Sequence, residues 1–170
     1  MKLDAPLTTP SLRGLSLVRR VGGESAALIS LLQSELDVAR ARASVERLLS
    51  HPSRSSQPAP PPSLSAARRA SAITATSELA WNAVRHGGGG VLCAWVDRRG
   101  RRLSFRLIVA DEGPGIQDIP WALQDQESST DTLGLGLPGS LRLVDQLTIT
   151  SPLPMLSHGT LVEACICFLL

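Results

Sequence analysis

Apolar and polar positions divide the 170-residue chain into short segments with the period of a helix or of a strand. Residues 25–33 form an apolar run after two glycines, and their number is typical of a buried strand. In residues 35–49, apolar side chains recur at helical spacing with charges between them, which predicts an amphipathic helix. A second helix is predicted from a cap at Ser63 or Ser65 to His86, because four glycines follow it.

Strand patterns dominate the rest of the chain. Two apolar runs, 91–96 and 103–110, flank a polar, arginine-rich turn and predict a β-hairpin. A short helix over 140–146 and two strands over 147–151 and 160–169 complete the pattern. The predicted fold class is therefore α+β, a two-layer sandwich with helices on one face of a mixed, mostly antiparallel sheet.

Two segments do not fit this pattern. Residues 51–63 hold five of the twelve prolines, which excludes a helix or a central strand. We expect this stretch to be an insert within one domain spanning 25–170, because neither side alone could bury a core. Residues 1–24 are expected to form an N-terminal arm or an extra strand.

Composition narrows the class of protein. With 43% hydrophobic and 19% charged residues, the chain is typical of a globular domain. No apolar run reaches the roughly 20 residues of a membrane span, and no signal-peptide pattern opens the chain. We therefore expect a cytoplasmic protein with three reduced cysteines and no membrane association.

Charge is distributed unevenly. Residues 1–110 hold 16 of the 17 Lys and Arg, whereas residues 111–170 hold one basic residue, Arg142, and eight acids. The positive charge is scattered, and three Trp, two Phe and no Tyr offer few rings to stack on bases, so nucleic-acid binding is not expected. Phosphates bound in the acidic part would have to be held by backbone amides and a metal ion.

Two motifs combine a carboxylate with residues that could help it to bind a ligand. Glu78 and Asn82 lie four residues apart on the second predicted helix and share a face, so they could hold a hydroxyl and a hard cation side by side. Asp111 follows a strand directly and precedes Gly113 and Gly115. A carboxylate there could accept a hydrogen bond from a buried amine, and the glycines let a ligand approach the backbone. Alone, each motif also fits an ordinary polar helix face or turn.

Two further motifs are glycine-rich. Residues 133–139 precede the predicted third helix, where backbone amides can cradle phosphates. Their G-x-G-x-x-G spacing does not follow a strand and no GK[ST] occurs, so neither a Rossmann fingerprint nor a P-loop is predicted. Gly159 and Thr160 enter the last strand, which by itself is a common turn-to-strand transition.

Together and in this order, the motifs resemble those of GHKL (Bergerat-fold) ATPases. The stretches TSELAWNAVRHGGGG, VADEGPGI and TLGLGLPGSLRLVDQLTITS are most similar to the anti-sigma regulatory branch and to RsbT-type serine/threonine-protein kinases. The resemblance covers about residues 25–168. It implies ATP and Mg²⁺ as ligands, with Glu78 as the general base and Asn82 as the Mg²⁺ ligand. The other nucleotide-binding residues that it implies are Asp111, Gly113, Gly115, Ile116, Leu133, Gly134, Leu135, Gly136, Leu137 and Thr160.

The resemblance also implies which part of the nucleotide each of these residues contacts. Asp111 would bind the adenine amino group, with help from Thr160 through a water molecule. Gly134, Gly136 and the start of the third helix would hold the β- and γ-phosphates, and residues 120–135 would form a lid over ATP. The middle of that lid, 126–128, departs from the RsbT-type pattern.

The function implied is a serine/threonine-protein kinase of a partner-switching stress module. It would phosphorylate a STAS-domain antagonist and release a downstream phosphatase or synthase. An ATP-binding anti-sigma factor that sequesters a sigma factor shares every motif and stays open, as does a homodimer. A detached histidine-kinase domain is disfavoured, because none of the three histidines lies in a predicted dimerising helix.

Overall fold

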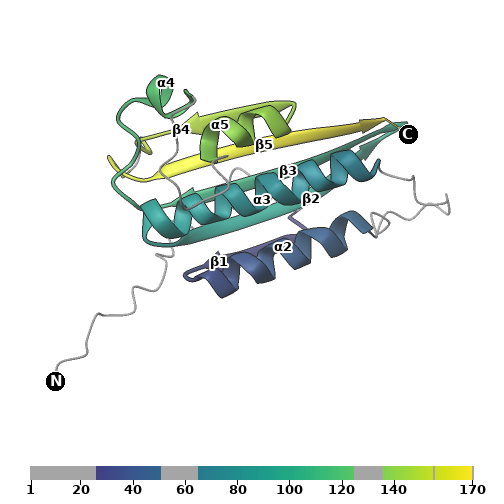
Figure 1. Cartoon of the computed structure of the whole chain (residues 1–170), viewed down its shortest axis with the longest axis horizontal. Helices are drawn as coiled ribbons and strands as arrows, with labels where there is room; N and C mark the ends of the chain where they lie inside the picture. Colours follow the sequence, from purple (N-terminus) through teal and green to yellow (C-terminus); the bar gives the residue numbers. More distant parts are fainter. Residues whose placement is uncertain (1–25, 51–64, 125–135, 155, 170) are drawn as a thin grey trace.

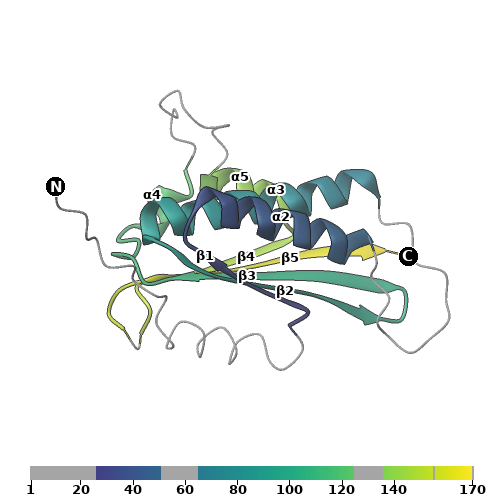
Figure 2. The ribbon, with the colours of Figure 1, turned by 90° about the horizontal axis from the view of Figure 1, so that it is seen from below.

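The structure is a computed structural model that describes residues 26–50, 65–124, 136–154 and 156–169 (Figure 1). The segments 1–24 and 51–63, expected to be an arm and an insert, lie outside the described residues. The described part has two layers, with the helices on one side of a five-stranded sheet (Figure 2).

The sheet is antiparallel, with strand order β1-β2-β3-β5-β4. The elements in chain order are β1 (Leu28–Leu32), α2 (Glu35–Ser50), α3 (Ala66–Gly87), β2 (Gly90–Arg99), β3 (Arg102–Asp111), α4 (Ile119–Ala122), α5 (Gly136–Leu143), β4 (Gln146–Thr150) and β5 (Thr160–Leu169). The predicted α+β sandwich is confirmed. The four described strand pairs are all antiparallel rather than mixed, because β5 enters between β3 and β4 and runs opposite to both.

Local chemistry sets the limits of α3. The Ser65 side chain accepts a hydrogen bond from the Arg68 backbone N–H at 3.2 Å, so Ser65 rather than Ser63 is the N-cap. Gly88 ends the helix in the left-handed conformation with φ 69°, which glycine adopts without a Cβ penalty. Within the described ranges, no helix is both long and apolar enough to cross a bilayer.

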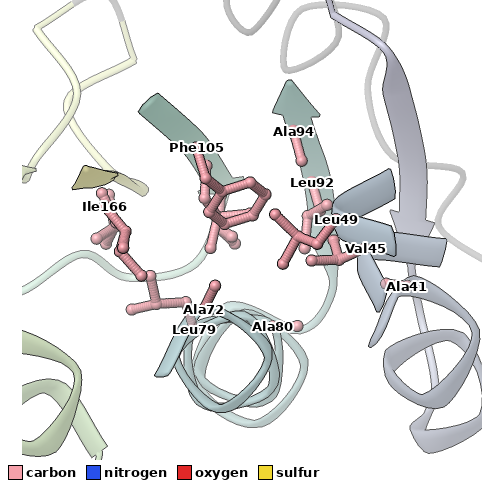
Figure 3. Close-up of a cluster of buried hydrophobic side chains, with 14 of the residues drawn as sticks. Ala41, Val45, Leu49, Ala72, Leu79, Ala80, Leu92, Ala94, Phe105 and Ile166 are labelled. Carbon is pink, nitrogen blue, oxygen red and sulfur yellow. The ribbon is translucent and has the colours of Figure 1, made fainter. Parts of the chain in front are cut away.

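The main core lies between α3 and the sheet. Small side chains on α3, including Ala72 and Ala80, bring the helix close to the strands, where Phe105 of β3 and Ile166 of β5 are about 1% exposed (Figure 3). A second apolar cluster lies on the other face of the sheet, because side chains alternate along each strand. Its buried members are Val91, Cys93, Trp95, Ile108, Ala110, Leu153 and Leu161.

The expected buried strand at 25–33 is instead an edge strand. β1 pairs only with β2 in the described part, and Ile29 and Leu31 are 44% and 46% exposed while Leu32 is fully buried. Alternate β1 side chains point away from the helices, so only half of the apolar run enters the core.

The two short helices also differ from the sequence prediction. α5 begins at Gly136, four residues earlier than predicted, and ends at Leu143. Pro138 is compatible with this start because an N–H in the first turn needs no helical partner. α4 was not predicted. It is capped by Asp118, whose carboxylate accepts from the Trp121 N–H at 2.8 Å, and has a proline in its first turn.

Candidate functional site

α3 carries a polar face that joins two of the predicted motifs. The Glu78 carboxylate accepts a hydrogen bond from the backbone N–H of Gly136 at 3.1 Å, across 58 residues of sequence. This contact places the acidic end of the face at the first residue of α5. Asn82 lies one turn further along the same face, as the four-residue spacing predicts.

The amide of Asn82 is not satisfied by the described residues. Its Nδ2 atom is buried and makes no hydrogen bond there. Buried polar atoms in folded proteins are nearly always paired, so an unpaired amide in a motif of this kind indicates a place for a ligand. No group of three or more His, Cys, Asp or Glu in the described part could hold a metal ion. The unpaired Nδ2 is a donor and fits an acceptor such as a phosphate oxygen, whereas a Mg²⁺ ion would be held by the Oδ1 of the same amide together with ligand phosphates.

Asp111 forms the second end of the site. It is the last residue of β3 and pairs with Thr160, the first residue of β5. Its Oδ1 accepts from the Gly113 N–H at 2.9 Å. Burial raises the pKa of Asp111, although backbone hydrogen bonds from Gly113 and Thr160 and the charge of His86 oppose that rise. This is a carboxyl group largely removed from water whose two oxygens can still accept a further hydrogen bond, which suits a ligand amine.

Gly87 lets α3 approach Asp111, a role that the sequence prediction did not assign. A Cβ at Gly87 would lie 2.4 Å from the Asp111 Cβ, and a Cβ at Gly113 would lie 2.6 Å from the Gly87 Cα. Gly87 is the last residue of α3 rather than the first of a glycine stop. The dense glycine run was a visible signal, but only the fold shows which glycine is in contact with the carboxylate.

Ser151 is a second residue that sequence reasoning missed. Its Oγ accepts from the Ile116 N–H at 2.6 Å, donates to the Gly159 carbonyl at 2.9 Å and lies 3.2 Å from the Thr160 Oγ. The Gly159 N–H also donates to the Gly113 carbonyl at 2.7 Å. One hydroxyl thus ties the loop after β3 to the start of β5, and no local pattern marks a serine at a strand end for this task.

The predicted site residues fall into two groups. Asp111, Gly113, Gly115, Ile116 and Thr160 gather at one end of the sheet, where β3 ends and β5 begins.

The second group is formed by Glu78, Asn82, Gly136 and Leu137 on α3 and α5. Leu137 packs its side chain against the main core, so of this residue only the backbone is left to face a ligand. Leu133, Gly134 and Leu135 lie outside the described residues, as does most of the expected lid.

The fold is an α+β two-layer sandwich, and its motifs are similar to those of GHKL ATPases. A curated relative, the serine/threonine-protein kinase RsbT of Bacillus subtilis (strain 168), is 38% identical over 92 residues, which are 54% of this chain and 66% of RsbT. The chain is RsbT-like, as its motifs predicted. The match spans just under two thirds of that relative's length.

No protein-family profile matches the chain. A solved structure, the mycobacterial sensor histidine kinase MprB, covers 56% of this chain and 72% of its own at a TM-score of 0.37 and 18% identity. That similarity is too low to support a conclusion.

Proposed function

We propose that the chain binds Mg²⁺-ATP along the polar face of α3 and transfers the γ-phosphoryl group to a serine or threonine of another protein. The Glu78–Gly136 hydrogen bond carries this proposal, because it brings a carboxylate next to the glycine-rich start of α5, with the unpaired amide of Asn82 one turn along the same helix. The similarity to RsbT, a serine/threonine-protein kinase, supports the same reaction.

The adenine would be held at the Asp111 end. Its exocyclic amine would donate a further hydrogen bond to the buried carboxylate, while Thr160 and Ser151 keep the adjoining backbone in place. Gly113 and Gly115 keep the loop packed against its neighbours, since a Cβ at Gly113 would lie 2.6 Å from the Gly87 Cα and a Cβ at Gly115 would lie 3.1 Å from the Ser151 Oγ. Specificity for adenine would thus come from the hydrogen bond to Asp111.

The phosphates would be held at the α5 end of the site. Along α3, Glu78 at this end lies about 13 Å from Gly87 at the Asp111 end, at the usual helical rise. Asn82 would be the protein ligand of Mg²⁺, and the ion, when bound, neutralises charge on the phosphates. Gly136 donates its N–H to Glu78 in this structure, so that N–H must change partner before it can bind a phosphate. Such a change would release the Glu78 carboxylate to accept the proton of the attacking hydroxyl.

A STAS-domain antagonist in a partner-switching module is the proposed acceptor. Sequestration of a sigma factor remains the second candidate, because nucleotide binding at the same residues would serve it equally. The two differ in one observable. Incubation with ATP and a STAS-domain partner from the same genome should yield phosphoserine or phosphothreonine by mass spectrometry. A tight complex without any phosphorylated residue would favour sequestration.

Nucleotide binding itself can be tested with Asn82. In calorimetry, Asn82→Ala should lose the part of the ATP affinity that depends on Mg²⁺, so the variant should bind alike with the ion and with a chelator. Ser77→Ala, next to the same face of α3, is a matched control and should keep the Mg²⁺ effect. A full Mg²⁺ effect in Asn82→Ala would contradict the assignment of the metal ligand.

A further inference from the structure

Two cysteines form part of a polar cluster far from the proposed nucleotide site. Cys165 and Cys167 alternate along β5 with the same parity as Leu161, so they lie on the sheet face opposite the helices. Both are free and half-exposed. The neighbouring strand places Arg106 opposite Cys165 and Ser104 opposite Cys167. The proposed kinase chemistry uses none of these groups.

Arg102 and Ser104 surround the Cys167 thiol with donors. Arg102 Nη2 donates to the Cys167 Sγ at 2.8 Å, and the Ser104 Oγ lies 3.9 Å from the same sulfur. The thiol is therefore held beside a cation and remains partly open to water. Reactive cysteines are found in partially exposed, electropositive surroundings of this kind.

The backbone of Cys167 is fixed as well. Its N–H donates to the Asp145 carboxylate at 2.7 Å, and its carbonyl accepts from Arg68 Nη2 at 3.1 Å. Arg68 and Asp145 are themselves paired at 2.6 Å. The ion pair thus holds both backbone polar groups of Cys167, and its two charges offset each other. The cations that act on the two sulfurs are therefore Arg102 and Arg106.

The two thiols differ in how readily they ionise. Burial opposes ionisation of Cys167, but the hydrogen bonds from Arg102 and Ser104 and the Arg102 charge outweigh it and lower the pKa of that thiol. Burial, aided by the neighbouring Cys167 charge, raises the pKa of Cys165 to about 11. Cys167 is therefore the nucleophile of the pair at neutral pH, and Cys165 stays protonated.

We propose that Cys167 is a site of reversible S-thiolation by low-molecular-weight disulfides. The Cys167 thiolate attacks one sulfur of the disulfide, so that a new S–S bond forms, the old one breaks and the second half leaves as a thiolate. Excess free thiol reverses the exchange by the same route, and no further oxidant is needed.

A disulfide between Cys165 and Cys167 is disfavoured by strand geometry. Residues two apart on a strand have Cα atoms about 6.7 Å apart, near the upper limit for a disulfide, although the two thiols lie within hydrogen-bond reach of each other. We therefore expect the partner of Cys167 to come from outside the chain, and the modification adds bulk on the exposed face of β5.

The test uses the full chain, reduced and then exposed to glutathione disulfide at neutral pH. Peptide mass spectrometry should place the first glutathione adduct on Cys167, ahead of Cys165 and of buried Cys93, and dithiothreitol should remove it. Arg102→Gln should slow the reaction by about three- to tenfold, because a less acidic thiol supplies less thiolate and its higher nucleophilicity offsets only part of that loss. Arg98→Gln makes the same charge change in the same hairpin, but Arg98 lies opposite helix-facing Leu103, so its rate should match wild type.

Two serine variants test the same assignment if Arg102→Gln does not fold. Cys167→Ser should abolish the fast adduct, whereas Cys165→Ser should retain it. Faster labelling of Cys165 or Cys93 would overturn the assignment. Equal rates in wild type and a folded Arg102→Gln would overturn the role of the guanidinium. ATP affinity should be unchanged in Cys167→Ser, since Thr160 lies at the other end of the strand.

Discussion

Gly87→Ala should separate helix stability from ligand binding. No positive φ is required at Gly87, so alanine fits the backbone and on helix propensity alone would add up to about 1 kcal/mol of stability. The new methyl group would nevertheless lie 2.4 Å from the Asp111 Cβ and 2.6 Å from its Cγ. The side chain of Asp111 must therefore move.

The size of that movement sets the expected loss of affinity. Ordinary contact between carbon atoms begins near 3.4 Å, so the carboxylate must shift by about 1 Å. A shift of that size stretches the 2.9 Å bond from Gly113 beyond hydrogen-bond range and misplaces the acceptor for adenine. Losing a hydrogen bond to a buried carboxylate costs about 1–3 kcal/mol, or roughly 5- to 150-fold in Kd.

Titration calorimetry with Mg²⁺-ATP measures this loss, and thermal unfolding shows whether the variant is folded. Gly88→Ala is the matched control. Nothing lies within 4 Å of a Cβ there, but φ is +69°, so alanine should lower stability by about 1–2 kcal/mol and leave affinity unchanged. Wild-type affinity in a folded Gly87→Ala, or an equal loss in both variants, would refute the reasoning.

Two further substitutions test the Asp111 end of the site. Burial raises the pKa of Asp111 above 3.8, so the folded protein binds the proton of this carboxyl more tightly than the unfolded chain does. The stability gained from this proton is complete below pH 3.8 and is lost as pH rises through the folded pKa. Asp111→Asn should therefore unfold at a higher temperature than wild type at pH 7 without ligand, yet bind ATP about 1–3 kcal/mol more weakly; a less stable variant would contradict the burial argument. Ser151→Ala leaves the Ile116 N–H without its acceptor and should lower the free energy of unfolding by about 1–2 kcal/mol in urea titrations, with weaker ATP binding. An unchanged urea midpoint would mean that another group replaces the hydroxyl.

The sequence predicts best those elements whose apolar side chains recur with the period of a helix or a strand and whose ends are marked by the sequence. α2 and β5 combine regular spacing with clear limits, and both were placed within one residue. The hairpin of β2 and β3 was found because a glycine turn interrupts two apolar runs, although each strand is longer than predicted. Position within the sheet was not predictable, since the exposure of Ile29 depends on β1 lying at an edge.

The parts of the site that were missed rest on contacts between distant residues. Gly87 contacts Asp111, and Ser151 binds Ile116, because the fold brings the end of a helix and the ends of several strands together. The early start of α5 has the same cause, because the Gly136 N–H is held by Glu78 from another helix. The motifs were recognisable because a helix brings Glu78 and Asn82 onto one face by local spacing alone.

Single-turnover phosphorylation of a STAS-domain partner at saturating ATP tests the central claim most directly. Glu78→Gln keeps an oxygen for the Gly136 N–H but cannot take a proton, whereas Glu78→Ala removes both functions. If Glu78 is the general base, both variants should bind ATP like wild type and transfer phosphate about 10²–10⁴-fold more slowly. Transfer at the wild-type rate by Glu78→Gln, or no transfer by wild type to a partner that it binds tightly, would contradict the account.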